Sequence, residues 1–350
     1  MDVKYSVPII FSKSFFSLLN NGEVNIDYID NIYGSSRSFF LGQAKYCETI
    51  PEVSSAELRY YIQIIHELGI KFHYTMNAPW CNGIERNQTG RDKIIRTIEY
   101  LANLNVDAFI IANPYLIDLC NREFPEIPII GSINMKTTTM YKLEMLFELG
   151  CSKVVIDKTL NRNIKFLESL GPLKKKVILL VNSTCLFDCP LEQYHVSENS
   201  HLSSGSNNIT NDVNFCIDYC IKQYVKNPEN LLKTSWIRPE DIDKYQNIGI
   251  EYFKIQGRTL TENEVFTLIR SYIAGSSPKN DLISIFPGFA EKLLLKSKEL
   301  NMSIPMIKNS FLEENNFIDS FFNKKVQCQG ACKICRHCLK MYELITERLV

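Results

Sequence analysis

The sequence contains no long apolar run, and its hydrophobic stretches are short and interrupted by charged residues. None of them approaches the roughly 18–20 residues that a membrane-spanning helix needs. The first residues, MDVKYSVPIIFSKSFF, carry an early acid and are broken by Lys13, which is typical of a first strand and not of a signal peptide. We therefore expect a soluble, cytoplasmic protein with no membrane insertion.

A net charge of one sign is also missing, because 39 lysines and arginines balance 39 aspartates and glutamates. Without an overall field, the chain has no general affinity for phosphate backbones or anionic membranes. Composition therefore gives RNA little support as a substrate, and a small molecule or a peptide is equally compatible with it.

Several motifs that mark common enzyme classes are absent. No G-x-G-x-x-G or G-x-x-x-x-G-K follows an expected strand, which argues against a dinucleotide site and a P-loop. No G-x-S-x-G or H-E-x-x-H occurs, so neither a serine nucleophile elbow nor a zinc-protease helix is indicated. Glu192 and His195 in PLEQYH are too few ligands for a catalytic zinc. A cysteine nucleophile formed by Cys189 and His195 remains an alternative.

The chain does contain a regular alternation of β-rich and helix-period segments between residues 7 and 275. Strands that are apolar on both faces and alternate with helices indicate a parallel sheet, and about eight such units fit a (β/α)8 barrel. We expect an α/β protein with a TIM-like barrel, and a doubly wound open sheet is the alternative. The expected strands are 7–12, 26–30, 71–77, 107–113, 127–134, 153–158, 176–182, 231–236 and 252–258, and clear helix patterns cover 54–69, 90–104 and 137–150.

Polar residues stand at the end of nearly every expected strand. In a barrel these ends meet at one rim, where active sites are built. Asparagine and aspartate are also ordinary turn residues, but the set as a whole predicts a polar pocket that accepts anions. The residues of this pocket are Tyr74, Asn77, Asn113, Asn134, Asp157, Lys158, Asn182, Ser235, Lys254 and Arg258.

Two segments depart from the alternation. Ser197–Asp212 is rich in serine and asparagine and predicts a mobile loop over the rim. From about residue 276 the strands stop, and helix patterns lead to a cysteine-rich end. We expect two parts: a barrel over 1–275 and a helical, cysteine-rich extension over 276–350.

Twelve cysteines are many for a chain without a secretory signal. In a reducing compartment, closely spaced cysteines more often bind metal or do redox chemistry than form disulfides. Cys47, Cys81, Cys120 and Cys151 stand alone, and the last two are expected in apolar, helical surroundings in which a thiol is a small hydrophobic group. The other eight fall in short-spaced groups: Cys185 and Cys189; Cys216 and Cys220; Cys328, Cys332, Cys335 and Cys338.

The first two cysteine pairs share a C-x3-C spacing. Cys185 and Cys189 follow an expected strand, and Cys216 and Cys220 lie at i and i+4 on one face of an expected helix. Together they could close an iron–sulfur or zinc site across the intervening loop. For the helical pair, packing in an apolar stripe is the alternative.

The C-terminal run has the spacing C-x3-C-x2-C-x2-C. Structural zinc sites usually take two cysteine pairs separated by a longer loop, whereas a dense run is closer to the ferredoxin-type motif that binds a [4Fe–4S] cluster. We favour an iron–sulfur cluster at Cys328, Cys332, Cys335 and Cys338, with zinc as the alternative. The first three cysteines also have the radical S-adenosylmethionine spacing, but they come after the barrel and not after an early strand.

Several stretches resemble the collagenase-like peptidase family U32, above all LVNSTCLFDCPLEQYH and SWIRPEDIDKYQNIGIEYFKIQGR. Further similar stretches are VPIIF, IDNIYGS, GIKFHYTMNAPWCNGIE, VDAFIIANPYLIDL and IRSYIAG, so the resemblance spans nearly all of 5–275. The better-understood branches of this family are iron–sulfur proteins that hydroxylate RNA bases or a quinone precursor without molecular oxygen, with prephenate as hydroxyl donor. The resemblance implies cluster ligation by Cys185 and Cys189, and less directly by Cys216 and Cys220. The C-terminal cysteine run departs from the family pattern and suggests a second cluster.

The resulting hypothesis is an oxygen-independent hydroxylase with one or two [4Fe–4S] clusters. Arg238, Lys254 and Arg258 would hold an anionic donor, because arginine pairs with carboxylates in a bidentate way. His195 would act as a proton donor. Two alternatives remain: an electron-transfer or accessory subunit that serves a redox or modifying partner protein, and a U32-type peptidase.

Overall fold

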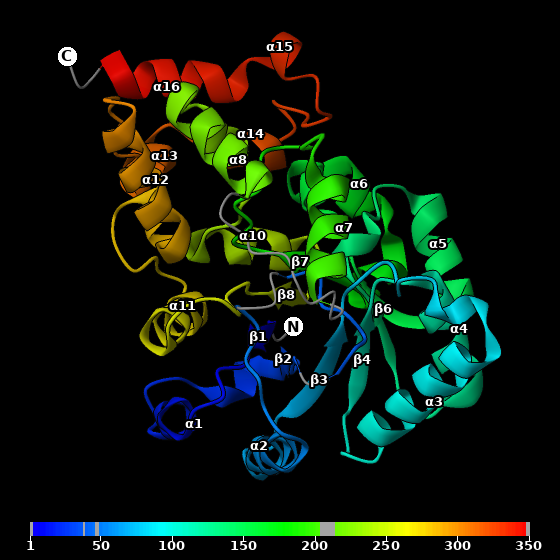
Figure 1. Cartoon of the computed structure of the whole chain (residues 1–350). Coiled ribbons are helices and arrows are strands. Elements are labelled where there is room, and N and C mark those ends of the chain that lie inside the picture. The colour runs from blue at the N-terminus through cyan, green and yellow to red at the C-terminus, as the bar shows by residue number, and fades with distance from the viewer. Residues whose placement is uncertain (1–2, 38, 46–48, 204–213, 348–350) are drawn as a thin grey trace.

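Eight parallel strands, in sequence order, form a closed barrel in the computed structural model of the chain (Figure 1). The structure describes residues 3–37, 39–45, 49–203 and 214–347. Strand β8 pairs with both β1 and β7, which closes the barrel and confirms the (β/α)8 prediction over the open sheet. The strands are β1 Lys4–Pro8, β2 Ile29–Gly34, β3 Lys71–Met76, β4 Ala108–Ile111, β5 Ile129–Gly131, β6 Cys151–Val155, β7 Val177–Leu180 and β8 Tyr252–Lys254.

One expected strand is wrong. Residues 231–236 do not join the sheet, because Asn230–Lys233 forms the short helix α9 and the indole of Trp236 donates a hydrogen bond back to Leu231 O at 2.8 Å. A short apolar run suits a buried helical turn as well as a strand, so its composition could not decide between them. The second strand also begins later than expected, at Ile29, because Ile26–Tyr28 forms the 3-10 helix η1.

Helices cover the outside of the barrel, and side-chain caps fix where several of them begin. Ser54 and Glu57 form a capping box at the start of α2, and Thr261 and Glu264 form another at the start of α11. Helix α11 ends at Gly275, whose φ of +66° suits a C-terminal glycine. The helices around the barrel are α1 Lys13–Asn20, α2 Ser55–Glu67, α3 Gln88–Ala102, α4 Pro114–Glu123, α5 Met140–Glu148, α6 Ile164–Ser169, α10 Ile242–Asn247 and α11 Glu262–Ala274.

In the part of the connection between β7 and β8 that the structure describes there are four α-helices: α7 Glu192–Ser203, α8 Phe215–Lys226, α9 and α10. The predicted loop over Ser197–Asp212 is therefore wrong for its first residues, which belong to α7, while 204–212 lie outside the described residues. The helix extends there because its polar side chains find partners. Ser200 Oγ donates to Val196 O at 2.6 Å, and Ser203 Oγ accepts a hydrogen bond from Gln43 N at 2.9 Å.

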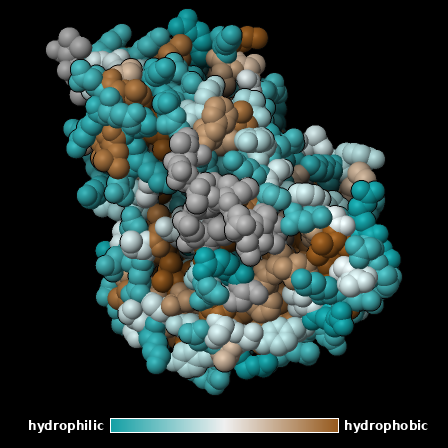
Figure 2. Space-filling model, in the orientation of Figure 1, coloured by the Kyte–Doolittle hydropathy of each residue, from teal (hydrophilic) through white to brown (hydrophobic). Residues whose placement is uncertain are grey.

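The extension after residue 276 contains the 3-10 helix η8 Leu282–Ile285 and five helices: α12 Pro287–Glu299, α13 Asn309–Glu314, α14 Asp319–Phe322, α15 Cys332–Cys335 and α16 His337–Glu347. Figure 1 shows α12 and α16 above the barrel; α12 packs against α8, and α16 packs against α9. Lys296 on α12 pairs with Asp218 on α8 at 2.9 Å, and one hydrophobic cluster runs from the barrel into the extension. Figure 2 shows hydrophobic groups gathered over α12, where Leu294 and Leu295 are exposed. The extension is thus packed on the connection that carries the cysteines.

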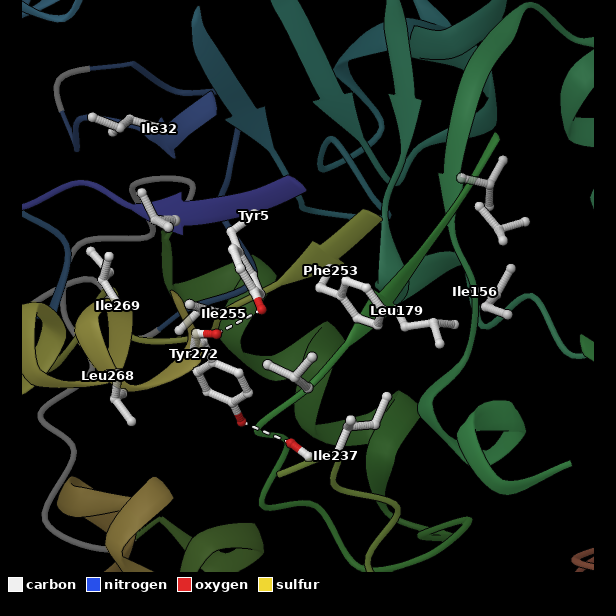
Figure 3. Packing of buried hydrophobic residues seen from close by; sticks show 14 of the residues in the cluster. Tyr5, Ile32, Ile156, Leu179, Ile237, Phe253, Ile255, Leu268, Ile269 and Tyr272 are labelled. Atoms are coloured by element: carbon white, nitrogen blue, oxygen red, sulfur yellow. Dashed lines mark hydrogen bonds between the residues drawn. The ribbon is translucent and has the colours of Figure 1, made fainter. Parts of the chain in front are cut away.

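Buried tyrosines tie the barrel to its outer layer. The Tyr5 hydroxyl donates to Tyr272 O at 2.8 Å, and the Tyr272 hydroxyl donates to Ile237 O at 2.9 Å (Figure 3). Both phenols keep a hydrogen bond while burying their rings. A second, smaller cluster contains the alternate residues of the strands, among them Tyr33, Ile110 and Leu180.

Candidate functional site

The asparagines at the strand ends mostly hold the rim in place. Asn113 caps α4 by accepting a hydrogen bond from Tyr115 N at 2.9 Å, and Asn182 exchanges two hydrogen bonds with the backbone of Gln256, at 2.8 and 2.7 Å. Asn134 donates to Asn77 O at 3.0 Å. Asn77 differs from the others, since its side-chain oxygen is buried without a hydrogen-bond partner among the described residues.

Two cations, Lys254 and Arg258, lie at the end of β8 and just after it. The Lys254 Nζ atom lies 3.4 Å from the centroid of the Tyr33 ring, and Arg258 donates to Ser35 Oγ at 3.2 Å and to Gln43 Oε1 at 3.3 Å. Burial, and then the charge of Arg258, hold the pKa of Lys254 well below its usual range. Within the described ranges no carboxylate lies within ion-pair distance of either cation. The pair is therefore suited to an anionic ligand.

A third cation, Lys45, lies close to Arg258, and the sequence analysis did not predict it. It lines a small pocket together with Ser35 and Arg258. Burial, and then the charge of Arg258, lower the pKa of Lys45 to about 8, and Cys185 and His195 lie within its electrostatic reach. No motif marks this single lysine in an irregular segment, so only the fold reveals it.

Charged residues also connect the rim to the loop after β7 that carries Cys185 and Cys189, which we call the first cysteine loop. Lys158, just after β6, donates a hydrogen bond to Glu192 Oε1, and Lys136 lies 3.0 Å from Asp188 and 3.7 Å from Glu192. The Cys185 thiol is among the groups that act on Lys158. Lys158 and Lys45 thus place positive charge within electrostatic reach of Cys185.

His195 lies one turn beyond Glu192 on α7. Its Nε2 atom is buried and has no hydrogen-bond partner among the described residues. Burial, and then the charge of Lys45, lower the pKa of His195. A buried imidazole with a free nitrogen at the rim has the chemistry of a proton carrier.

Helix α8 presents its cysteines to the first cysteine loop. Cys216, Cys220 and Tyr224 are spaced by four residues and share one face. The Tyr224 hydroxyl donates to Thr184 O at 3.1 Å, next to Cys185. Cys185, Cys189 and Cys216 all act electrostatically on the Cys220 thiol, whose pKa burial raises to about 12. The structure thus gathers the four predicted ligands around one region.

The donor set fits a metal that prefers sulfur, although its side chains do not converge on one point. All four thiols are free of disulfides. Across the described part of the chain, no three His, Cys, Asp or Glu side chains are arranged to hold a metal ion. Side-chain rotations would be needed to bring Cys185, Cys189, Cys216 and Cys220 together, and the loop and helix that carry them are held side by side by Tyr224.

The C-terminal cysteines form a separate group. Cys332 and Cys335 are the ends of α15, and Cys338 is in the first turn of α16. Cys328 and Cys338 pack against the hydrophobic core, whereas Cys335 is exposed. Cys328 and Cys338 each lie within electrostatic reach of the other three thiols.

The lone cysteines behave as expected where the structure describes them. Cys120 and Cys151 are buried in the core, and burial raises the pKa of each to about 12; Cys120 lies in α4 as expected, whereas Cys151 begins strand β6 and is not helical. Cys81 is buried as well and accepts a hydrogen bond from Asn113. Cys47 lies outside the described residues.

Arg238 is placed differently from the other predicted rim cations. Its guanidinium is 2% exposed and pairs with Asp241 through two hydrogen bonds, of 2.7 and 3.1 Å. It also donates to Asn309 O at 3.0 Å and to Glu313 Oε1 at 3.3 Å. These partners belong to η7 (Pro239–Asp241) and to α13, so the structure gives Arg238 a contact that joins the extension to the barrel.

Known proteins resemble this chain over most of its length. An uncharacterized protease, MJ1657, from Methanocaldococcus jannaschii is 24% identical over 275 residues, which cover 78% of this chain and 76% of that protein. The tRNA hydroxylation protein P of Escherichia coli is 24% identical over 147 residues, 41% of this chain and only 30% of that protein. The solved structure of the U32 peptidase Mk0906 has the same fold, with a TM-score of 0.54 and 18% identity over 73% of this chain and 93% of that one. Residues 29–275 match the family described as peptidase family U32. The chain therefore belongs to peptidase family U32.

Proposed function

We propose that this protein is an oxygen-independent hydroxylase whose [4Fe–4S] cluster is held at the barrel rim by Cys185, Cys189, Cys216 and Cys220. The observation that carries the proposal is the gathering of these four thiols beside a pocket of three cations, for which the described residues supply no carboxylate within ion-pair distance. A cluster bound there would supply one-electron transfer.

The pocket residues have separate roles in this proposal. Lys254, Arg258 and Lys45 bind the anionic hydroxyl donor, for which the dicarboxylate prephenate is the proposed molecule. Their charges are matched to carboxylates, and burial strengthens the attraction because little water screens it. His195 carries a proton at Nε2, and Asn77 offers its free side-chain oxygen to the substrate.

The name of the Escherichia coli relative supports tRNA as the modified substrate. A chain with no net charge would have to recognise RNA through local contacts, since its overall field supplies no attraction. We therefore expect binding to a single exposed base and its neighbours and only weak affinity for RNA in general.

The peptidase alternative has the family name in its favour. It would need Cys189 activated by His195, but the buried Nε2 atom of His195 makes no hydrogen bond to that thiol. An activated nucleophile and its base lie within hydrogen-bond reach, although apo geometry is often looser. The arrangement therefore supports ligation by Cys189 better than nucleophilic attack.

The test is anaerobic purification followed by iron and sulfide counts, electron paramagnetic resonance and an assay on tRNA with prephenate. Cys185→Ala and Cys189→Ala are expected to lose iron and turnover together. Cys151→Ala is the matched control, because Cys151 is a buried cysteine that belongs to none of the short-spaced cysteine groups. This variant should keep its iron and its turnover. A wild-type protein that contains no iron after air-free preparation would overturn the proposal, and peptide cleavage that survives iron chelation would favour the peptidase. Activity that appears only with a co-purifying protein would favour an accessory subunit.

A further inference from the structure

Arg162, at the end of the 3-10 helix η5 (Lys158–Arg162), is a buried cation without an anionic partner. Its side chain is 2% exposed, and within the described ranges no carboxylate lies within ion-pair distance. The Nη1 atom donates to Leu232 O, but Nε and Nη2 have no hydrogen-bond partner among the described residues. Two of its donor nitrogens therefore lack an acceptor among the described residues.

Aromatic rings surround the guanidinium. Its Cζ atom lies 4.3 Å from the centroid of the Trp236 ring, 5.2 Å from that of Phe317 and 5.6 Å from that of Phe321. Ring faces attract a cation only modestly, whereas removing a full charge from water is costly. Arginine cannot escape this cost by losing its proton. A negative charge close to Arg162 would offset this cost.

The C-terminal cysteine run lies close to Arg162, because the Phe317 ring, 5.2 Å from the Arg162 Cζ atom, stacks on His337 at 5.0 Å, and His337 is the residue before Cys338. Arg162 acts electrostatically on both Cys328 and Cys338. Thiolates bound to a metal are fully deprotonated and do carry charge.

We propose that Cys328, Cys332, Cys335 and Cys338 hold a metal centre of net negative charge and that Arg162 is its counter-charge. Four thiolates leave a net charge of about −2 on either a zinc ion or an oxidised [4Fe–4S] cluster, so the two candidates share the chemistry that Arg162 requires. This inference does not depend on the proposed hydroxylase function.

The backbone of the run suits such a centre. Gly330 has φ +80° and Arg336 has φ +52°, and these left-handed residues turn the chain between successive cysteines. The described side chains do not yet converge on one point, so the centre would form by rotation of the four thiols. Cys335 is exposed and Cys332 is half-buried, and neither belongs to the hydrophobic core, so both can move without disturbing it.

The proposed centre lies next to the first cysteine loop. A Cβ atom placed on Gly330 would lie 3.5 Å from Cε1 of Phe187, the residue between Cys185 and Cys189. The two cysteine groups are therefore neighbours in space although about 140 residues separate them in the chain.

The first experiment compares the metal content of three variants of the full chain, purified without air. Cys332→Ser/Cys335→Ser removes two ligands, Ile334→Ala changes the exposed residue between them and is the matched control, and Cys185→Ala/Cys189→Ala disables the rim group. The Cys332→Ser/Cys335→Ser variant is expected to lose one zinc, or about four irons and four sulfides, relative to the control. Loss of zinc and loss of iron each support the proposal and identify the metal. Equal metal content in this variant and the control would overturn it.

The second experiment tests the counter-charge. Arg162→Met is expected to release the C-terminal metal to a chelator at least fivefold faster than wild type, and Arg162→Lys, which keeps the charge, at an intermediate rate. Alkylation of Cys332 and Cys335, followed by mass spectrometry, reports the same site without requiring activity. If Arg162→Met folds and retains the metal as long as wild type, the counter-charge role is wrong. If Arg162→Met does not fold, the metal site is tested by alkylation of the wild-type protein. Thiols that are protected from alkylation until a chelator is added support the site, and thiols that react equally with and without chelator overturn it.

The outcome separates this inference from the hydroxylase proposal. A Cys332→Ser/Cys335→Ser variant that loses its metal but keeps the rim cluster supports the second centre whether or not tRNA is hydroxylated. Loss of the rim cluster in Cys185→Ala/Cys189→Ala bears only on the proposed function.

Discussion

The hydroxyl group of Tyr224 lies 3.1 Å from the carbonyl oxygen of Thr184 and 2.5 Å from Thr234 Oγ1. Through these contacts helix α8 is fixed to the loop that carries Cys185, with Cys220 one turn before the tyrosine. Removing the hydroxyl takes away the hydrogen bond to the half-buried Thr184 carbonyl, whereas Thr234 Oγ1 keeps its hydrogen bond to Asn230 O at 3.0 Å, so the cost is about 1 kcal/mol.

Tyr224→Phe should therefore loosen the first cysteine group without removing any ligand. We expect a lower free energy of unfolding by that amount and faster loss of iron under air, measured by the decay of the cluster absorbance. Tyr219→Phe, on the exposed side of the same helix, is the control. Equal cluster lifetimes in the two variants would mean that Tyr224 does not organise the site.

Lys254 and Arg258 are predicted to bind the carboxylates of the donor. Losing one charge-assisted contact costs about 1.5–3 kcal/mol, so Lys254→Met should weaken prephenate binding roughly ten- to hundredfold. Isothermal titration calorimetry measures this without turnover. Lys153→Met is the matched control, because Lys153 also lies over a tyrosine ring, that of Tyr252, at 3.2 Å, but before the strand ends. Equal affinities for Lys254→Met and wild type would remove Lys254 from the site.

The barrel could be predicted from the sequence because each strand and helix is locally consistent with it. Apolar runs of strand length alternate with capped helix patterns, and this order is repeated eight times. Residues 231–236 were misassigned because an apolar run without periodicity suits either a helix turn or a strand.

The site was predictable only where a motif marked it. The cysteine spacings pointed to the two groups, but nothing distinguished Lys45 or Arg162 from other cations, since their importance comes from what the fold buries beside them. Arg238 illustrates the opposite case. It stands in a recognisable stretch, WIRPED, yet the structure pairs it with Asp241, three residues later.

Arg238→Met should accordingly affect stability more than donor binding. The variant leaves Asp241, 1% exposed, as a buried charge, and breaking a buried pair in this way costs about 3–5 kcal/mol. The double variant Arg238→Met/Asp241→Leu removes both charges and should recover much of that loss in urea unfolding. If Arg238→Met instead unfolds like wild type and binds prephenate more weakly, the original prediction of a donor-binding arginine would be supported.

The last prediction concerns His73, a buried residue of β3. Burial lowers the pKa of His73 to about 4; Asp30 and Asp107 act to raise it, and Lys254 and Lys153 act to lower it. In the unfolded chain the pKa returns to about 6.5, so between these values only the unfolded state binds the proton. Stability must then fall as the pH decreases from about 6.5 to 4, by up to about 3 kcal/mol from this group alone. His73→Gln removes the titration, and the difference between the urea unfolding curves of wild type and variant isolates it from the carboxylates, which both proteins share. A difference that stays constant from pH 7 to pH 4.5 would show that His73 is not held neutral by the fold.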